Sequence, residues 1–127
     1  MSISFLNKNK NDSSIGNGIN YSTDEVKTND VWIDGKPIYR KVINGNFPSS
    51  SAWTSFADFE GMDTMVKVYG YFIGTDGRKM TLPQTEQNHL VALSYQPSTN
   101  SIEIKQQGSD FYGRPCCIII EYTKTID

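Results

Sequence analysis

Short runs of β-branched and aromatic residues recur along this chain, and a polar or glycine-containing turn follows most of them. Such runs favour extended strands, because branched and flat side chains pack well on a pleated surface. We expect strands over residues 31–33, 37–43, 64–73, 79–82, 89–95, 101–107 and 116–124. About seven short strands at this spacing predict an all-β fold, an antiparallel β-sandwich that is jelly-roll-like.

Turn residues predict how some of these strands connect. The dipeptide Asp34-Gly35 separates two runs, and a tight hairpin turn needs a residue that adopts a positive φ without steric cost. We therefore expect a hairpin here, with a positive φ at Gly35. A second hairpin is expected at 75–78, and the polar turn 96–100 is expected to join a third pair of strands.

Two strands have patterns that indicate their place in a sheet. In 64–73, alternate side chains lie on opposite faces. One face carries Val66, Val68, Gly70 and Phe72, and the other carries Lys67, Tyr69, Tyr71 and Ile73. The closing strand is apolar on both faces as far as Ile120, which is typical of a central strand. We also expect the opening and closing strands to lie near each other.

Helix signals are scarce. Only residues 55–60 favour a turn or two of helix, and Gly61 follows them as a stop signal. No internal repeat and no coiled-coil heptad is visible in the sequence.

The chain of 127 residues has the length of one domain with a flexible N-terminal arm. Residues 1–20 are rich in Asn, Ser, Lys and Gly, a composition typical of flexible linkers. Two interpretations of this arm stay open, a disordered tail and an arm that docks on another protein or a neighbouring copy through Ile3, Phe5 and Leu6. Residues 21–127 are expected to form the β-sandwich.

Composition argues against several classes of function. A net charge of −2 leaves no basic surface for a nucleic-acid backbone, so we expect no nucleic-acid partner. The N-terminus has no apolar run long enough for a signal peptide or a membrane span, so we expect synthesis in a cytoplasm and no membrane partner. Cys116 and Cys117 are neighbours on a strand and point to opposite faces, so we expect both thiols to be reduced.

Catalysis finds little support in the sequence. His89 is the only histidine, and no residue near it in sequence is placed to orient it as a base. No phosphate-binding loop, dinucleotide fingerprint or metalloprotease motif is present. Asp58, Glu60 and Asp63 cluster around Gly61, but their spacing favours a solvated acidic loop over a calcium site. We expect a protein that is not an enzyme, with no cofactor and no metal.

Aromatic residues in polar stretches are the candidate ligand-binding set. Trp53 follows three serines, and Phe111-Tyr112-Gly113-Arg114 forms a second aromatic stretch with an arginine. Flat rings with polar neighbours suit sugars and protein epitopes, and a guanidinium donates hydrogen bonds to hydroxyls or carboxylates. We select Trp53, Phe111, Tyr112 and Arg114. The alternative interpretation is that these rings fill the ends of the sandwich.

Two motifs at the ends of the expected domain carry a family resemblance. The opening motif is Tyr21-Ser22-Thr23-Asp24-Glu25-Val26, followed by Trp32-Ile33-Asp34-Gly35-Lys36-Pro37-Ile38-Tyr39-Arg40-Lys41. The closing motif is Glu121-Tyr122-Thr123-Lys124-Thr125-Ile126-Asp127. Together they resemble the C-terminal β module of phage tail fibre, baseplate and head fibre structural proteins.

The resemblance implies a structural protein of a phage virion, made in the host cytoplasm. Its expected work is attachment, either to host-surface carbohydrate or to other virion proteins through the N-terminal arm. The family also implies a homotrimer. The module usually ends a longer protein, whereas a short arm precedes it here, which raises a small decoration or adaptor protein as an expectation. The competing class is a virion enzyme that degrades glycan or peptidoglycan, which would pair Asp58 or Asp63 with Asp110 across a cleft.

Overall fold

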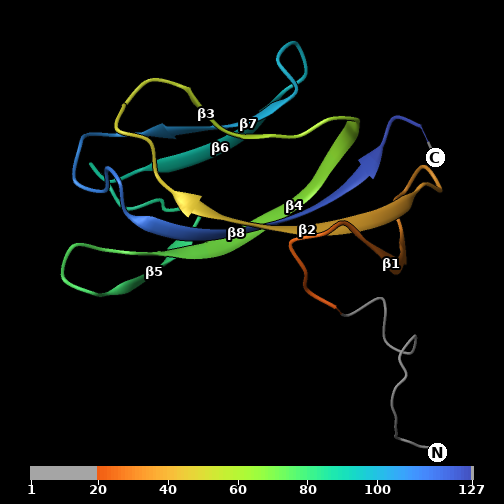
Figure 1. The fold of residues 1–127 in the computed structure, drawn as a ribbon, viewed down its shortest axis with the longest axis horizontal. Coiled ribbons are helices and arrows are strands. Elements are labelled where there is room, and N and C mark those ends of the chain that lie inside the picture. The colour runs from red at the N-terminus through yellow and green to blue at the C-terminus, as the bar shows by residue number, and fades with distance from the viewer. Residues whose placement is uncertain (1–19, 127) are drawn as a thin grey trace, which may run out of the picture.

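The computed structural model describes residues 20–126 of the chain and contains two antiparallel β-sheets packed face to face (Figure 1). The described residues form strands and no helices, so the all-β sandwich predicted from the sequence is confirmed. Among them, no helix is long and apolar enough to cross a membrane. The strands are β1 (Val26–Val31), β2 (Pro37–Asn46), β3 (Thr54–Asp58), β4 (Met62–Ile73), β5 (Lys79–Leu82), β6 (Val91–Gln96), β7 (Ser101–Gln106) and β8 (Pro115–Lys124).

The five-stranded sheet has the order β1-β2-β8-β4-β5, and the three-stranded sheet has the order β3-β7-β6. β8 lies between β2 and β4, which confirms that the closing strand is central. β2 joins β1 to β8, so the opening and closing strands are near each other, as expected. Because the two end motifs lie on adjacent strands, they come together although almost the whole domain separates them in sequence.

The core fills the space between the two sheets. Phe72, Ile118 and Ile120 of the five-stranded sheet and Ile102 and Ile104 of the three-stranded sheet are completely buried. These residues alternate with partly exposed ones along their strands, as a sheet with one face on the core requires. Phe47 and Phe59, in the connections before β3 and before β4, are also buried and pack against this cluster.

The hairpin prediction at Asp34-Gly35 is confirmed, with one change of boundary. Gly35 has a φ of +87°, and its N–H donates to the carbonyl of Trp32. The turn therefore uses residues 32–36, and Val31 pairs with Pro37. The first strand thus lies before the expected segment 31–33, because the turn itself takes up most of that segment.

The helix expected at 55–60 is wrong, since β3 occupies this segment and pairs with β7. A helix of so few residues is marginal by itself, because the first turn costs more conformational entropy than its hydrogen bonds return. Pairing with β7 supplies those bonds instead, across a register shift between Ser55 and Ala57. A Cβ atom added at Gly45 would lie 3.0 Å from the Phe56 ring, so β3 packs closely on β2 of the five-stranded sheet at this glycine.

The two ends of the sandwich carry different parts of the chain. One end, which we call the loop end, contains the connections 47–53, 74–78, 83–90 and 107–114. The opposite end contains the β1–β2 hairpin, the β6–β7 turn and the C-terminal residues (Figure 1). The predicted arm, residues 1–20, lies outside the described residues except for Asn20.

Candidate functional site

The four residues selected from the sequence all lie at the loop end. Trp53 is on the connection between β2 and β3 and is 46% exposed. Phe111, Tyr112 and Arg114 are on the connection between β7 and β8 and are partly buried. The two connections meet at Phe47, whose backbone bonds to Gly113 and Arg114. The structure therefore brings the four residues to one end of the molecule.

Phe111 and Arg114 have structural contacts of their own. The Phe111 ring lies with its centre 4.7 Å from that of the core residue Phe72. Arg114 donates hydrogen bonds from Nε to the carbonyl of Ile73 at 2.8 Å and from Nη2 to the carbonyl of Gly74 at 3.0 Å. Those nitrogens hold the β4–β5 turn against the β7–β8 connection. Trp53 is the most exposed of the four side chains.

A histidine–aspartate pair lies beside Phe111, and the sequence analysis missed it. His89 Nε2 lies 2.7 Å from Asp110 Oδ2, and the imidazole is 5.6 Å from the Phe111 ring, centre to centre. His89 Nδ1 is buried without a hydrogen-bond partner among the protein atoms. The expectation that His89 has no orienting partner is therefore wrong.

The pairing of β6 with β7 causes this meeting. Val91 is opposite Gln106, and the N–H of Gln107 donates to the carbonyl of Leu90. Residues just before β6 consequently lie beside residues just after β7. The predicted hairpin around 96–100 could have indicated this contact. When its strand register is continued past the strand ends, His89 comes beside the 107–114 connection.

The pair lines a shallow hollow of about 360 Å³ at the loop end. Three carboxylates line it, those of Asp76, Glu86 and Asp110, with one guanidinium, that of Arg78. Arg78 pairs with Asp76 at 3.3 Å while both side chains stay well exposed. An excess of acidic groups disfavours an anionic ligand. Carboxylates accept hydrogen bonds from hydroxyls, and an imidazole has one nitrogen that accepts and one that donates. Met80 and Phe111 add apolar surface to the lining.

The carboxylates considered for a hydrolase do not meet. Asp58 ends β3 and pairs with Ser101 at the start of β7, whereas Asp110 follows the end of β7. Asp63 instead forms an ion pair with Lys36 at 2.7 Å, at the end opposite the loop end. Within residues 20–126, no group of three or more histidine, cysteine, aspartate or glutamate side chains is placed to hold a metal ion.

The two end motifs are joined by direct side-chain contacts. The Tyr122 hydroxyl donates to Glu25 Oε1 at 2.6 Å, and Lys124 Nζ lies 2.8 Å from Glu25 Oε2. Burial by itself would raise the pKa of the Glu25 carboxyl, but the bonds from Lys124 and Tyr122 outweigh it and lower the pKa. Burial, together with the bond to Glu25, raises the pKa of Tyr122. Around neutral pH, the Glu25 carboxyl therefore stays ionised and the Tyr122 hydroxyl stays protonated, as this contact requires.

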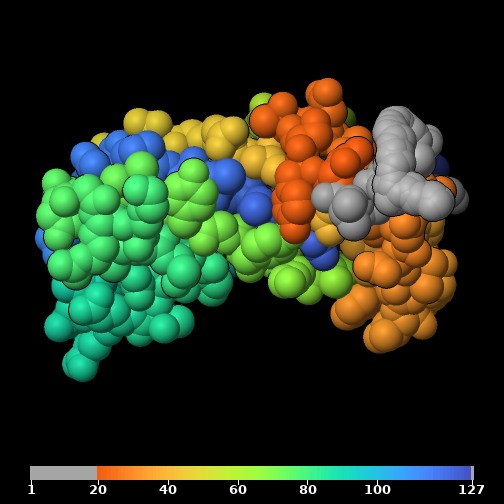
Figure 2. All heavy atoms as spheres, turned by 90° about the horizontal axis from the view of Figure 1, so that it is seen from below, coloured from red at the N-terminus to blue at the C-terminus, as the bar shows by residue number. Residues whose placement is uncertain are grey.

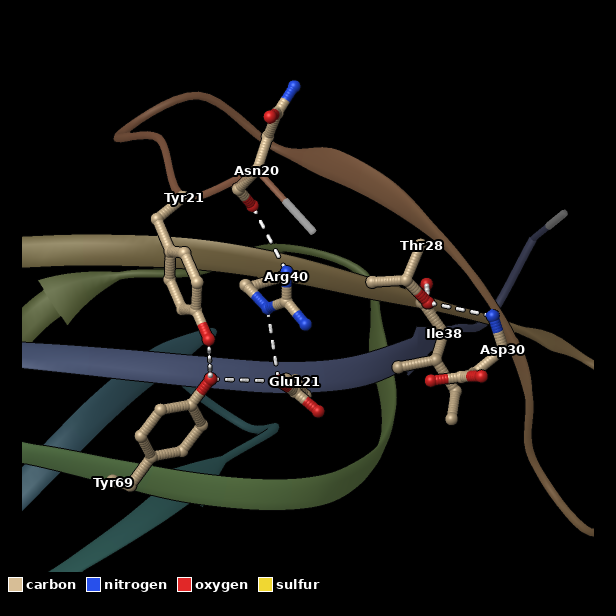
Figure 3. Close-up of polar contacts among 8 residues, drawn as sticks. All are labelled: Asn20, Tyr21, Thr28, Asp30, Ile38, Arg40, Tyr69 and Glu121. Atoms are coloured by element: carbon tan, nitrogen blue, oxygen red, sulfur yellow. Dashed lines mark hydrogen bonds and ion pairs between the residues drawn. The ribbon is translucent and has the colours of Figure 1, made fainter. Parts of the chain in front are cut away.

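A second set of contacts links the motifs on the outer face of the five-stranded sheet (Figure 3). Arg40 Nε donates to Glu121 Oε2 at 3.0 Å, and the Tyr69 hydroxyl donates to the same oxygen at 2.9 Å. The Tyr21 ring lies 4.5 Å from the Arg40 guanidinium, and its hydroxyl lies 3.4 Å from that of Tyr69. Burial and the bonds to Tyr21 and Glu121 raise the pKa of Tyr69. The motif residues thus hold the chain entry, β2, β4 and β8 together.

Comparisons of this chain with protein-family models, with curated proteins and with solved structures found no match.

Proposed function

We propose that this protein is a structural component of a phage virion that attaches to the host surface through its loop end, with carbohydrate as the ligand class. The observation that carries the attachment proposal is that the two ends of the domain differ. The exposed Trp53 and the hollow beside His89 lie at the loop end. The chain enters near Arg40, toward the end that carries the β1–β2 hairpin. A module anchored through its entry side therefore presents the loop end outward.

The chemistry of the loop end favours a neutral, hydroxylated ligand. Trp53 offers a flat apolar ring to the carbon–hydrogen face of a sugar, and Tyr112 adds a second ring with a hydroxyl. The carboxylates of Asp76, Glu86 and Asp110 accept hydrogen bonds from sugar hydroxyls and repel phosphate or carboxylate groups. Single shallow sites of this kind bind weakly, so the proposal includes a homotrimer in which equivalent loop ends act together.

The competing function, a glycan- or peptidoglycan-degrading enzyme, has weaker support. Glycoside hydrolysis commonly uses two carboxyl groups facing each other across the bound sugar. Asp58 and Asp63 lie away from the loop end, which holds Asp110. Attachment needs only surface rings and hydrogen-bonding groups, and the loop end offers both.

The test is the double substitution Trp53→Ala with Tyr112→Ala in the phage genome. The matched control is Ile33→Ala, which removes an apolar side chain that is 90% exposed at the β1–β2 turn. The expected result is virions that contain the normal amount of this protein and adsorb poorly to host cells, while the control adsorbs normally. Virions that adsorb normally with the altered protein in place would overturn the attachment proposal. Virions that lack the altered, folded protein would show that the loop end docks on the virion instead.

A further inference from the structure

The outer face of the five-stranded sheet carries two rows of side chains that differ from an ordinary solvated face. In one row, Ile119 of β8 lies between Val42 of β2 and Tyr69 of β4, because it pairs with both residues. In the next row Cys117 stands between Asn44 and Tyr71. By contrast, the outer face of the three-stranded sheet presents Glu103 and Lys105 of β7. Antiparallel sheets with a solvated face alternate apolar and polar residues. The apolar residues of these two rows lie between Asn44 and the polar row of Arg40 and Glu121, and an apolar patch with a polar rim is typical of a contact surface.

This face is also hollowed. A depression of about 440 Å³ lies over the ends of β2, β4 and β8, with Tyr71, Ile73 and Cys117 in its lining. Tyr71 is 45% exposed. In Figure 2, the blue atoms of β8 lie between the gold atoms of β2 and the green atoms of β4, and the segment that begins at residue 20 lies over another part of the face.

The first described residues, Asn20 and Tyr21, lie on this same face. The carbonyl of Asn20 accepts a hydrogen bond from Arg40, and Tyr21 reaches Tyr69 (Figure 3). In the sequence of residues 1–19, Met1, Ile3 and Phe5 alternate with Ser2 and Ser4. Alternation of apolar and polar residues is the pattern of a strand that buries one side.

The length of the intervening segment is sufficient for the first residues of the chain to reach another copy. Residues 8–19 are mostly polar and reach about 40 Å when extended. On the same domain, the row of Arg40 and the row of Cys117 are four residues apart along β2 and β8, which is roughly 13 Å along a strand. The segment is longer than a contact within one domain needs, so it also reaches a neighbouring copy.

We propose that residues 1–5 of one copy lie on the outer face of the five-stranded sheet of a second copy, with Ile3 and Phe5 against the row of Cys117 and Tyr71. Each copy gives one segment and receives one, so the exchange closes in a cyclic oligomer. The depression adjoins the loop end, but the four residues selected for attachment are not in its lining. The tests below measure cross-linking and oligomeric state and not adsorption, so they can fail independently of the attachment proposal.

The native thiol of Cys117 makes a direct test possible in the full-length protein. In the variant Phe5→Cys, mild chemical oxidation is expected to form a disulfide to Cys117 of another copy, which gives cross-linked dimers and higher species on a non-reducing gel. The matched control is Ser4→Cys, whose side chain has the opposite direction in an extended segment. Cys116 stays out of the reaction because it is buried and burial raises the pKa of its thiol to about 12. Peptide mapping identifies the linked residues.

Two outcomes of the cross-linking would overturn the inference. A disulfide within one chain would show that the segment covers its own domain, and equal cross-linking in both variants would show that Phe5 has no defined place. A second comparison uses two double variants. The first is Ile3→Asp with Phe5→Asp, and its control is Ser2→Asp with Ser4→Asp, which adds the same charge to the other side of the segment. Light scattering should show loss of the oligomer in the first pair alone. An oligomer that survives in both pairs would mean that the copies associate without this segment.

Discussion

Gly70 is the position where a single methyl group should do most damage to this fold. It lies in β4 opposite Ile118 of the central strand β8 and has a φ of +148°. A Cβ atom added at this position would fall well inside contact distance of the carbonyl oxygen of Cys117 and 3.1 Å from the Cα of Ile118. The obstacle is backbone, which no rotamer change can move. Substitution Gly70→Ala must therefore either separate β4 from β8 or force a different φ.

The cost of Gly70→Ala has two parts that a second glycine separates. Gly77 also has a positive φ, +84°, but a Cβ atom there would meet nothing within 4 Å. Gly77→Ala should consequently show backbone strain alone, about 1 kcal/mol. Gly70→Ala adds the clash with β8, and opening a central pair of strands exposes core residues such as Phe72 and Ile118. We expect a total loss above roughly 4 kcal/mol, a size reserved for mutations that break a backbone or core constraint.

Urea denaturation followed by circular dichroism measures both variants under identical conditions. If Gly70→Ala is too unstable to purify, the fraction of soluble protein and the thermal midpoint of Gly70→Ala and Gly77→Ala still rank the two. A loss for Gly70→Ala within 1 kcal/mol of the loss for Gly77→Ala would refute the reasoning, because it would mean that β4 and β8 move apart at little cost.

Three further outcomes follow from the contacts of the motifs and the first turn. Tyr122→Phe removes the hydroxyl that donates to Glu25 and should lower the free energy of unfolding by about 1–2 kcal/mol, with most of that loss absent in a Glu25→Gln background. The pKa of Glu25 is lower in the folded state, so its contribution to the free energy of unfolding is present above the unfolded-state pKa and should be lost as the pH falls through the folded-state pKa. In urea titrations at several pH values, Glu25→Gln should reduce the acid-side pH dependence of the free energy of unfolding. Gly35→Val should cost about 1 kcal/mol or more from its positive φ, and a thermal midpoint equal to that of the unaltered protein would count against the turn assignment.

Alternation along single strands made part of the fold predictable. The two faces of β4 from Lys67 onward and the central place of β8 followed from local patterns, since Ile118 and Ile119 point to opposite sides and both are apolar. Val66 does not follow the pattern, because a register shift between Met65 and Lys67 packs Met65 against the core instead. β3 was not predictable in this way. Phe56 and Phe59 also fit the three-residue spacing of a helix, and only the contact with β7 decides in favour of a strand.

The candidate site was less accessible from sequence, because a sequence lists hydrogen-bonding groups without their partners. Arg114 was chosen as a donor for a ligand, and a donor of that kind satisfies the carbonyls of Ile73 and Gly74 equally well. His89 and Asp110 are 21 positions apart, and only the register of β6 on β7 brings them together.

The end motifs and the loop end make different demands on the sequence. Glu25, Arg40, Glu121 and Tyr122 each need a specific partner on another segment, so a change at one of them leaves a partly buried polar group unpaired. Trp53 at the loop end needs no such partner, because its exposed ring can be replaced without opening the core. The surface proposed for attachment therefore lies where the fold tolerates change. Under the proposed attachment function, this division is the physical reason to place the ligand at the loop end and not at the joined chain ends.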